Sequence, residues 1–333
     1  MSSFGFGQMI QKLKKEPKTI VFTEGTDARI LEASSRLLAS NFINPVLIGD
    51  PDEIYECAEE CGFNIRGANI ISPYEFDKFD EMVDLFMEIR KEKIASREDA
   101  IKVLRENNYF GTMLVKMGLA DCLLGGATYS TADTVRPALQ LIKTKPGNSI
   151  VSSCFILVRP GATGQNVVLA MGDCGININP NEDELVEIAE GTIECAKVFG
   201  IEPCVAFLSY STNGSGSGPA VDKMRNAADK TKKRNPHIPI DGEMQFDAAV
   251  SPSVAKKKHP NSPVAGHANT FIFPDISAGN IGYKIAQRMG NFEAYGPILL
   301  GLNSPINDLS RGCTAAEVYS MAIITAAFAT NKD

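Results

Sequence analysis

Residues 19–40 read TIVFTEGTDARILEASSRLLAS and join two runs of different periodicity. Thr19–Glu24 is a β-branched, apolar run that stops at Gly25, as a buried strand does. Asp27–Ser40 spaces its apolar residues three and four apart, which is the pattern of a helix with one buried face. A short apolar strand followed directly by such a helix is typical of parallel sheets with helices on both faces. This stretch therefore predicts an α/β fold.

The same alternation recurs along the rest of the chain. Expected strands and the helices that follow them lie at 45–49 and 51–61, 121–126 and 131–143, 204–208 and 221–233, 270–273 and 280–289, and 297–300 and 314–330. Single hydrophobic cores stop growing at about 250–300 residues, so a chain of 333 residues is expected to form two domains.

The turn residues of Lys145–Asn148 mark the expected boundary between these domains. Beyond it, 149–158 and 167–171 are adjacent strand patterns with no helical pattern between them, which predicts a hairpin. The pattern leaves open which domain takes the strand and helix from Pro297 onward.

The chain has 33 Lys and Arg against 40 Asp and Glu, a net charge of −7. A net acidic chain is a poor partner for polyanions, so neither nucleic acid nor an anionic membrane surface is an expected partner. An anionic ligand would have to be held locally, by a few arginines and by helix N-termini.

The sequence also bears on localisation and metals. The N-terminal residues lack a signal-peptide pattern, and no apolar stretch approaches the ~20 residues of a membrane span. The eight cysteines contain no C-x-x-C pair, which is typical of a reducing compartment, so we expect a cytoplasmic protein. Cys57 and Cys61 lie one helical turn apart, but no Cys or His accompanies them nearby, and no metal site is expected.

Residues 307–314, NDLSRGCT, are expected to follow the strand Pro297–Leu300 and to open the final helix. Ser310 and Arg311 would then lie where α/β folds bind ligands, and Arg can bind a phosphate through two parallel hydrogen bonds. Thr314 and Glu317 have the spacing of a capping box, so Glu317 either faces a ligand or caps the helix.

Three other segments contain residues that could contact a ligand. Ser130–Pro137, STADTVRP, opens a helix with a plausible Ser130–Asp133 capping box, and Arg136 directly before a proline is unusual inside a helix. Arg90 is expected to end a helix. Ser211–Gly218, STNGSGSG, is either an anion-binding turn or a surface loop. The three histidines show no local arrangement that would support a His-based hydrolase.

Taken together, five stretches of the sequence resemble the phosphate acetyltransferase (phosphotransacetylase) family. They are Gly125–Gln140 (GGATYSTADTVRPALQ), Leu208–Pro219 (LSYSTNGSGSGP), Asp241–Val250 (DGEMQFDAAV), Phe273–Lys284 (FPDISAGNIGYK) and Tyr295–Cys313 (YGPILLGLNSPINDLSRGC).

The resemblance implies two α/β domains with mainly parallel sheets and an active cleft between them. The first domain would comprise residues 1–146 plus 300–333, the C-terminal segment returning to it, and the second residues 147–299. Family members are usually homodimers joined through the second domain, so a homodimer is expected here.

The implied reaction is acetyl-CoA + phosphate ⇌ acetyl phosphate + CoA, with coenzyme A, acetyl phosphate and inorganic phosphate as small-molecule partners. No tightly bound cofactor and no metal are expected in the chemical step. By the resemblance, Arg311 holds the phosphate, Ser310 stabilises developing charge, and Glu317 takes the position of the general base, which is usually Asp. The residues expected to bind substrate are Arg90, Arg136, Ser130, Thr131 and Lys284, with the two arginines matching coenzyme A positions.

Several alternatives remain open at this point. A phosphate butyryltransferase would share these motifs but have a larger acyl pocket. A non-catalytic coenzyme A-sensing domain and a metal-dependent decarboxylating dehydrogenase are further candidates, although the sequence offers no convincing carboxylate cluster for a metal. The mechanistic rival to direct transfer is an acyl-enzyme on Cys313 or Cys154.

Overall fold

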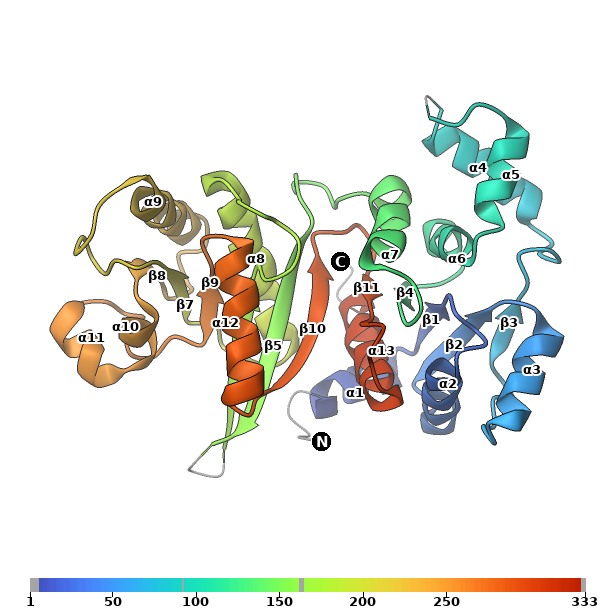
Figure 1. Cartoon of the computed structure of the whole chain (residues 1–333), viewed down its shortest axis with the longest axis horizontal. Coiled ribbons are helices and arrows are strands. Elements are labelled where there is room, and N and C mark those ends of the chain that lie inside the picture. Colours follow the sequence, from blue (N-terminus) through green and yellow to red (C-terminus); the bar gives the residue numbers. More distant parts are fainter. Residues whose placement is uncertain (1–5, 92, 162–164, 331–333) are drawn as a thin grey trace. The chain divides into compact units, whose positions relative to one another are not determined.

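The structure is a computed structural model that describes residues 6–91, 93–161 and 165–330 (Figure 1). By its contacts the described chain divides into two compact units. We name the two units by their place in the sequence: residues 6–146 together with 302–330, at the two ends of the described chain, are the outer unit, and residues 147–301, between them, are the central unit. Each is built around one sheet, one all-parallel and one mostly parallel. The predicted α/β fold is confirmed.

The sheet of the outer unit is parallel throughout, in the order β11-β4-β1-β2-β3. Its strands are β1 (Lys18–Phe22), β2 (Ile43–Ile48), β3 (Asn69–Ile71), β4 (Cys122–Gly125) and β11 (Ile306–Asp308). The apolar run that begins at Thr19 thus becomes the central strand of this sheet. Since all five strands run the same way, their carboxyl ends open at one edge.

Helices cover both faces of this sheet (Figure 1). They are α1 (Phe6–Lys15), α2 (Ala28–Ser40), α3 (Pro51–Glu60), α4 (Phe79–Ile89), α5 (Arg97–Leu104), α6 (Asn107–Lys116), α7 (Thr131–Pro137), the π-helix η1 (Ala138–Ile142) and α13 (Ala315–Ala329). Val21 and Leu123 pack with α4, α5, α6 and η1 in one apolar cluster. Helices α2 and α13 pack against each other and contact strands of the same sheet on its other face. The alternation of side chains along each strand produces these two layers.

The sheet of the central unit has the order β10-β5-β6-β9-β7-β8. Its strands are β5 (Ser152–Pro160), β6 (Asn166–Gly172), β7 (Val205–Leu208), β8 (Ile240–Met244), β9 (Thr270–Ile272) and β10 (Glu293–Leu300). Strand β5 pairs antiparallel with both β6 and β10, and the remaining pairs are parallel. The predicted hairpin of 149–158 with 167–171 is confirmed.

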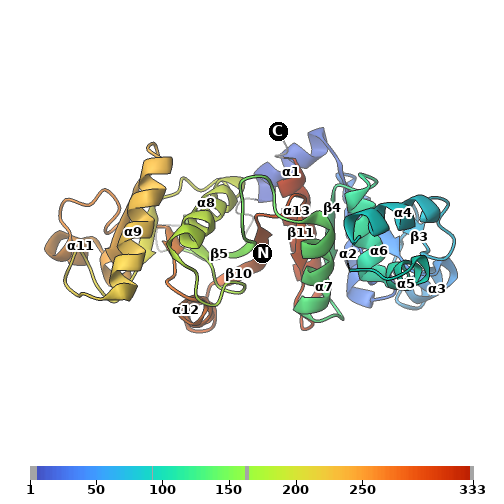
Figure 2. The same cartoon turned by 90° about the horizontal axis from the view of Figure 1, so that it is seen from above.

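Two groups of helices also enclose this second sheet. They are α8 (Glu182–Val198) with α9 (Pro219–Arg234), and α10 (Phe246–Val250) with α11 (Pro252–Lys258) and α12 (Ile276–Met289). Phe207 packs into the apolar cluster of α8 and α9, while its neighbour Leu208 packs into the cluster that includes residues of α10, α11 and α12. Figure 2 shows α8 and α9 on the side of the sheet away from α12.

One expectation about connectivity is wrong. Pro297–Leu300 does not lead into residues 307–314, because it is the end of β10 and pairs antiparallel with β5 in the central unit. The strand that precedes Ser310 is β11, which pairs in parallel with β4. Periodicity does not detect β11, since it is three residues long and only Ile306 is apolar.

Candidate active site

The carboxyl ends of β1, β4 and β11 open into three loops, 23–27, 126–130 and 309–314, at one edge of the outer unit's sheet. The ends of β4 and β11 are joined through the backbone, because the N–H of Leu309 donates to the carbonyl of Gly125 at 2.7 Å. Ser130 and Ser310 therefore share an edge, the place where open α/β sheets bind ligands.

The turn that carries Ser310 and Arg311 exposes both side chains. The Cys313 N–H donates to the Ser310 carbonyl at 2.9 Å, and the Gly312 N–H donates to Ser310 Oγ at 3.3 Å. The Ser310 hydroxyl thus accepts from the backbone and keeps its own hydrogen for a ligand. The Arg311 guanidinium pairs with none of the described residues, so its donors are available to an anion.

Glu317 forms the capping box that its spacing predicted. Its Oε2 accepts the Thr314 N–H at 2.7 Å and the Thr314 hydroxyl at 3.0 Å, and its own N–H donates to Thr314 Oγ1 at 3.2 Å. The carboxylate is nevertheless exposed, and Oε1 contacts no polar group of the described residues. The cap therefore leaves one oxygen free to accept a proton.

Only half of the second expected capping box is present. Ser130 Oγ accepts the Asp133 N–H at 3.3 Å, but the Asp133 carboxylate accepts the Ser130 hydroxyl at 2.6 Å and not the Ser130 N–H. This hydroxyl lowers the pKa of Asp133 below its usual value. Thr131 and Arg136 are exposed on α7, with Arg136 Nη1 3.7 Å from Asp133 Oδ1. At Pro137, which lacks an N–H, α7 gives way to the π-helix.

The two remaining predicted substrate residues lie elsewhere. Arg90 ends α4, as expected, and its Nε is buried without a hydrogen-bond partner among the described residues. Lys284 belongs to α12 of the central unit, where its ammonium lies 5.9 Å from the centre of the Tyr283 ring. The outer unit alone thus brings together Ser130, Thr131, Ser310, Arg311 and Glu317 at one sheet edge.

Sequence reasoning missed Glu24, a buried carboxyl at the end of β1. Its Oε1 accepts the N–H groups of Gly126 and Thr128, each at 3.0 Å, and its Oε2 accepts the Thr23 hydroxyl at 2.8 Å. Burial raises the pKa of Glu24 above its usual value, and these hydrogen bonds lower it in part. Glu24 therefore fixes the loop that leads to Ser130.

Asp308, the last residue of β11, is a second buried carboxyl at this edge. Its Oδ1 has no hydrogen-bond partner among the described residues and lies directly over Gly126. Burial raises the pKa of Asp308, and the nearby Thr131 hydroxyl lowers it in part. Gly126 has a φ of +98° and no room for a Cβ, so only glycine lets the chain pass so close to this carboxyl directly after β4.

Hydrogen bonds hold the glycine-rich loop Ser211–Gly218 in place. Buried Glu243 accepts the Ser211 hydroxyl and the Gly214 N–H, both at 2.9 Å, and Arg225 Nε at 2.8 Å. Burial alone would raise the pKa of Glu243, but Arg225 and the two loop donors bring it below its usual value. The glycines are thus part of an ordered turn around a carboxylate of this chain.

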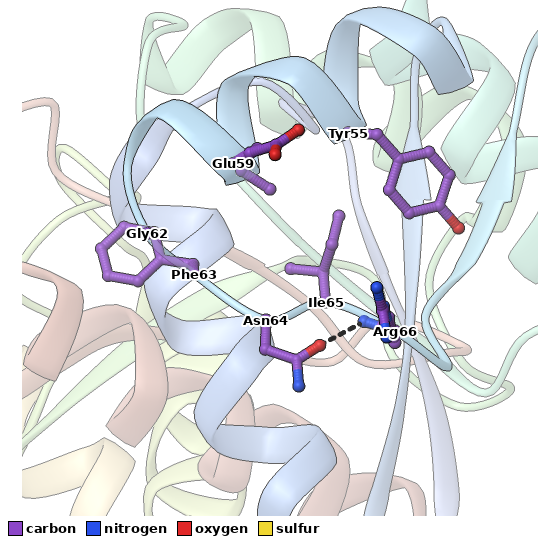
Figure 3. A pocket seen from close by; sticks show the side chains of 8 residues that line it. Tyr55, Glu59, Gly62, Phe63, Asn64, Ile65 and Arg66 are labelled. Carbon is purple, nitrogen blue, oxygen red and sulfur yellow. Dashed lines mark hydrogen bonds between the residues drawn. The ribbon is translucent and has the colours of Figure 1, made fainter.

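A hollow of about 420 Å³ lies beside α3 and is lined by Tyr55, Glu59, Phe63 and Arg66 among others (Figure 3). The Arg66 N–H donates to Asn64 Oδ1 at 3.1 Å across its floor. The hollow follows the end of α3 and precedes β3, so it lies at the amino edge of the sheet. Ser310 lies at the opposite, carboxyl edge, and the hollow is therefore separate from the candidate active site.

The structure bears on metal sites, membrane spans and the state of the cysteines. Within 6–91, 93–161 and 165–330, no group of three or more His, Cys, Asp or Glu side chains could hold a metal ion. None of the helices in those ranges is both long and apolar enough to span a bilayer. All eight cysteines are free thiols.

Comparison with known proteins gives a consistent result. The family described as "Phosphate acetyl/butaryl transferase" matches residues 6–326. A phosphate acetyltransferase of Bacillus subtilis is 50% identical over 97% of this chain and 98% of its own length. The chain belongs to this family. A Corynebacterium glutamicum phosphate acetyltransferase is 45% identical over 96% of this chain and 95% of its own.

A solved structure agrees with the fold. The phosphotransacetylase from Streptococcus pyogenes superposes with a TM-score of 0.93 at 52% identity, covering 98% of each chain. The family resemblance inferred from the five sequence stretches is confirmed.

Replacing Glu24 with Gln is expected to change how stability depends on pH. The raised pKa means that the folded state of the natural chain loses stability as pH rises above 4.5, through the folded pKa of Glu24. Gln keeps an acceptor for both backbone N–H groups but does not ionise. The Tm of Glu24→Gln relative to the natural chain should therefore rise between pH 4.5 and 8.

The control for this measurement is Glu24→Ala, which lacks the acceptors and should have a lower Tm at every pH. A Tm difference between the Gln variant and the natural chain that stays constant with pH would show that Glu24 does not titrate in this range.

Proposed function

We propose that this chain transfers an acetyl group directly between coenzyme A and phosphate, acetyl-CoA + phosphate ⇌ acetyl phosphate + CoA. Its family membership makes it a phosphate acetyltransferase (EC 2.3.1.8). The observation that carries the finer mechanism is the exposed Ser310-Arg311 turn, held at the carboxyl edge of the sheet immediately before α13. Besides coenzyme A and acetyl-CoA, the proposed substrates are acetyl phosphate and inorganic phosphate. No tightly bound cofactor and no metal take part in the proposed chemical step.

Arg311 would bind the phosphoryl group. Its guanidinium is exposed and unpaired among the described residues, and a planar guanidinium can bind two phosphate oxygens in parallel. The turn also immediately precedes the N-terminus of α13, where the helix dipole favours an anion. A net acidic chain can thus bind an anionic substrate locally, at Arg311 and the N-terminus of α13.

Glu317 and Ser310 would carry the transfer itself. A free thiol has a pKa of about 8.5, so Glu317 would accept the proton of coenzyme A as the sulfur attacks the acetyl carbonyl carbon. The Ser310 hydroxyl, whose oxygen already accepts the Gly312 N–H, would donate to the oxyanion that forms. The C–O bond to phosphate then breaks, and phosphate leaves with the electron pair.

The state of the cysteines supports direct transfer over an acyl-enzyme. Burial raises the pKa of Cys313, which lowers the thiolate fraction near the site. Cys154 is fully buried in β5 of the central unit. Arg29 Nη1 lies 3.6 Å from Cys313 Sγ, but this thiol and that of Cys154 are both buried, whereas an activated cysteine nucleophile is partly exposed.

Cationic and hydroxyl side chains would bind coenzyme A. Arg90 and Arg136 would contact its phosphates, and Ser130, Thr131 and Lys284 would supply further polar contacts. The exposed start of α7 supports this assignment, because Ser130 and Thr131 stand at a helix N-terminus on the same edge as Ser310.

A homodimer joined through the central unit is the proposed assembly, and the cytoplasm is its proposed location. The proposed dimer is supported by an apolar groove of about 720 Å³, which is bounded by Leu169, Phe246, Ile285 and Phe292 among others. On α12, the side chains at 281, 285 and 289 form an exposed apolar stripe. Exposed apolar patches of this kind mark protein contacts.

The deciding assay is the release of coenzyme A thiol from acetyl-CoA in the presence and absence of phosphate. The natural chain should release thiol only with phosphate, and Arg311→Ala should reduce kcat/KM by at least about 10²-fold, the scale for loss of one prepared electrostatic contact. Butyryl-CoA measured in parallel separates the acetyl from the butyryl specificity. Phosphate-independent release, or none, would contradict the proposed reaction.

Glu317→Gln separates the two roles of this side chain. Gln also completes a capping box, so Tm should stay within about 2 °C of the natural value. It can neither accept the proton of coenzyme A nor return it to the departing thiolate in the thiol-release direction. We expect kcat to fall about 10²–10⁴-fold, as measured in the same thiol-release assay. Glu317→Asp, which restores the usual family residue, is the active control. A Gln variant with near-normal turnover would place the base elsewhere.

Ile285→Glu tests the proposed dimer. A charge in the middle of the apolar stripe should weaken association, because burying an unpaired carboxylate is costly, and sedimentation velocity should show monomer where the natural chain is a dimer. Leu119→Glu, at an exposed apolar position in the outer unit, is the matched control. Equal association of both variants would exclude this face.

A further inference from the structure

Arg29, the second residue of α2, lies where all three loops of the candidate site meet. Its Nη1 donates to the carbonyl of Arg311 at 2.8 Å and to that of Cys313 at 3.2 Å. Its Nη2 donates to the carbonyl of Ala127 at 2.8 Å. One side chain thus contacts both the catalytic turn and the loop that leads to Ser130.

The remaining donors of Arg29 are occupied by Asp27. Nε donates to Asp27 Oδ1 at 2.9 Å, and Nη2 donates to Asp27 Oδ2 at 2.8 Å. A guanidinium has five N–H donors, and the oxygens of these residues supply five acceptors. Arg29 therefore has no donor left for a substrate, in contrast with Arg311.

The orientation of the peptide planes connects Arg29 with Ser310. In a trans peptide the C=O and the following N–H point in opposite directions. Because Arg29 holds the carbonyl of Arg311, the N–H of Gly312 in the same plane points away from Arg29, and it donates to Ser310 Oγ at 3.3 Å. The contact thus fixes which lone pair of the Ser310 hydroxyl is used.

The same geometry connects Arg29 with Glu317. Arg29 holds the carbonyl of Cys313, so the Thr314 N–H of that plane points away and donates to Glu317 Oε2 at 2.7 Å. The carbonyls of Arg311 and Cys313, both bound by one guanidinium, therefore set the direction of two N–H groups, and each N–H binds one of the two proposed catalytic side chains.

We propose that Arg29 is a positioning residue that holds the Ser310 hydroxyl and the Glu317 carboxylate in their working orientations without touching substrate. This inference rests on the proposed function. A misplacement of about 1 Å at a reacting group can cost about 10²-fold in rate. The loss of Arg29 should therefore appear in kcat, while the KM values for acetyl-CoA and phosphate, which it does not contact, change little.

The test compares Arg29→Lys and Arg29→Ala with Arg36→Lys and Arg36→Ala in the phosphate-dependent thiol-release assay. Arg36 is the matched control, since it lies on the same helix and pairs with Glu32 at the surface. We expect both Arg29 variants to lose about 10²-fold in kcat with KM within about threefold, because an ammonium cannot reproduce the fork of a guanidinium. The Arg36 variants should keep the natural kcat.

Guanidinium ion added at sub-denaturing concentration provides the second readout. It should restore part of the kcat of Arg29→Ala and have no such effect on Arg36→Ala, which a general loss of stability would not produce. Tm measured for every variant shows which are folded at the assay temperature, and Arg29→Lys serves if the Ala variant is not.

Three outcomes would overturn the inference. A folded Arg29 variant with the natural kcat would show that the contacts only stabilise the fold. A rise in KM with unchanged kcat would make Arg29 a binding residue. A kcat loss that only matches the unfolded fraction, with no rescue by guanidinium, would also refute positioning. Absence of phosphate-dependent thiol release by the natural chain is a different result, since it refutes the proposed function itself.

Discussion

The parallel pairing of β11 beside β4 is the constraint on which the candidate site depends. Ile306, Asn307 and Asp308 pair with Leu123, Leu124 and Gly125, and this register brings the Leu309 N–H to the Gly125 carbonyl. Side chains alternate along the strand, so Asn307 Nδ2 reaches Thr325 of α13 at 2.8 Å, while Ile306 joins the core on the other face. A slip of one residue would exchange these faces and displace the turn that follows.

Arg29 and Arg311 differ in how many of their N–H donors are occupied by neighbouring residues. Asp27 and three backbone carbonyls take every donor of Arg29, whereas the described residues leave the Arg311 side chain unpaired. Two buried carboxyls are likewise used within the chain, since Glu24 and Glu243 each accept backbone N–H groups of loops. An acidic chain can bind an anion at this turn because the exposed Arg311 guanidinium pairs with none of the described carboxylates.

Much of the fold follows from the sequence because long apolar runs and helical periodicity report burial directly. The β5–β6 hairpin, the α/β class and the Thr314–Glu317 cap were predictable for this reason. Strand β11 was not, since its burial depends on polar side chains whose partners lie elsewhere in the chain. Arg29 was missed for a related reason: its partners Ala127 and Arg311 contribute backbone carbonyls, and no residue type in the sequence identifies a carbonyl as an acceptor.

The order in which the strands occur along the chain has a consequence for synthesis. Residues 147–301 form the central unit without interruption, whereas β11 and α13, which complete the outer unit, are made after them. During translation the central unit can fold as soon as its residues emerge, while β4 keeps an unpaired edge and the core beneath α13 stays open until then. The Ser310 turn thus comes into being last, so a nascent chain carries no assembled site before its outer sheet is complete.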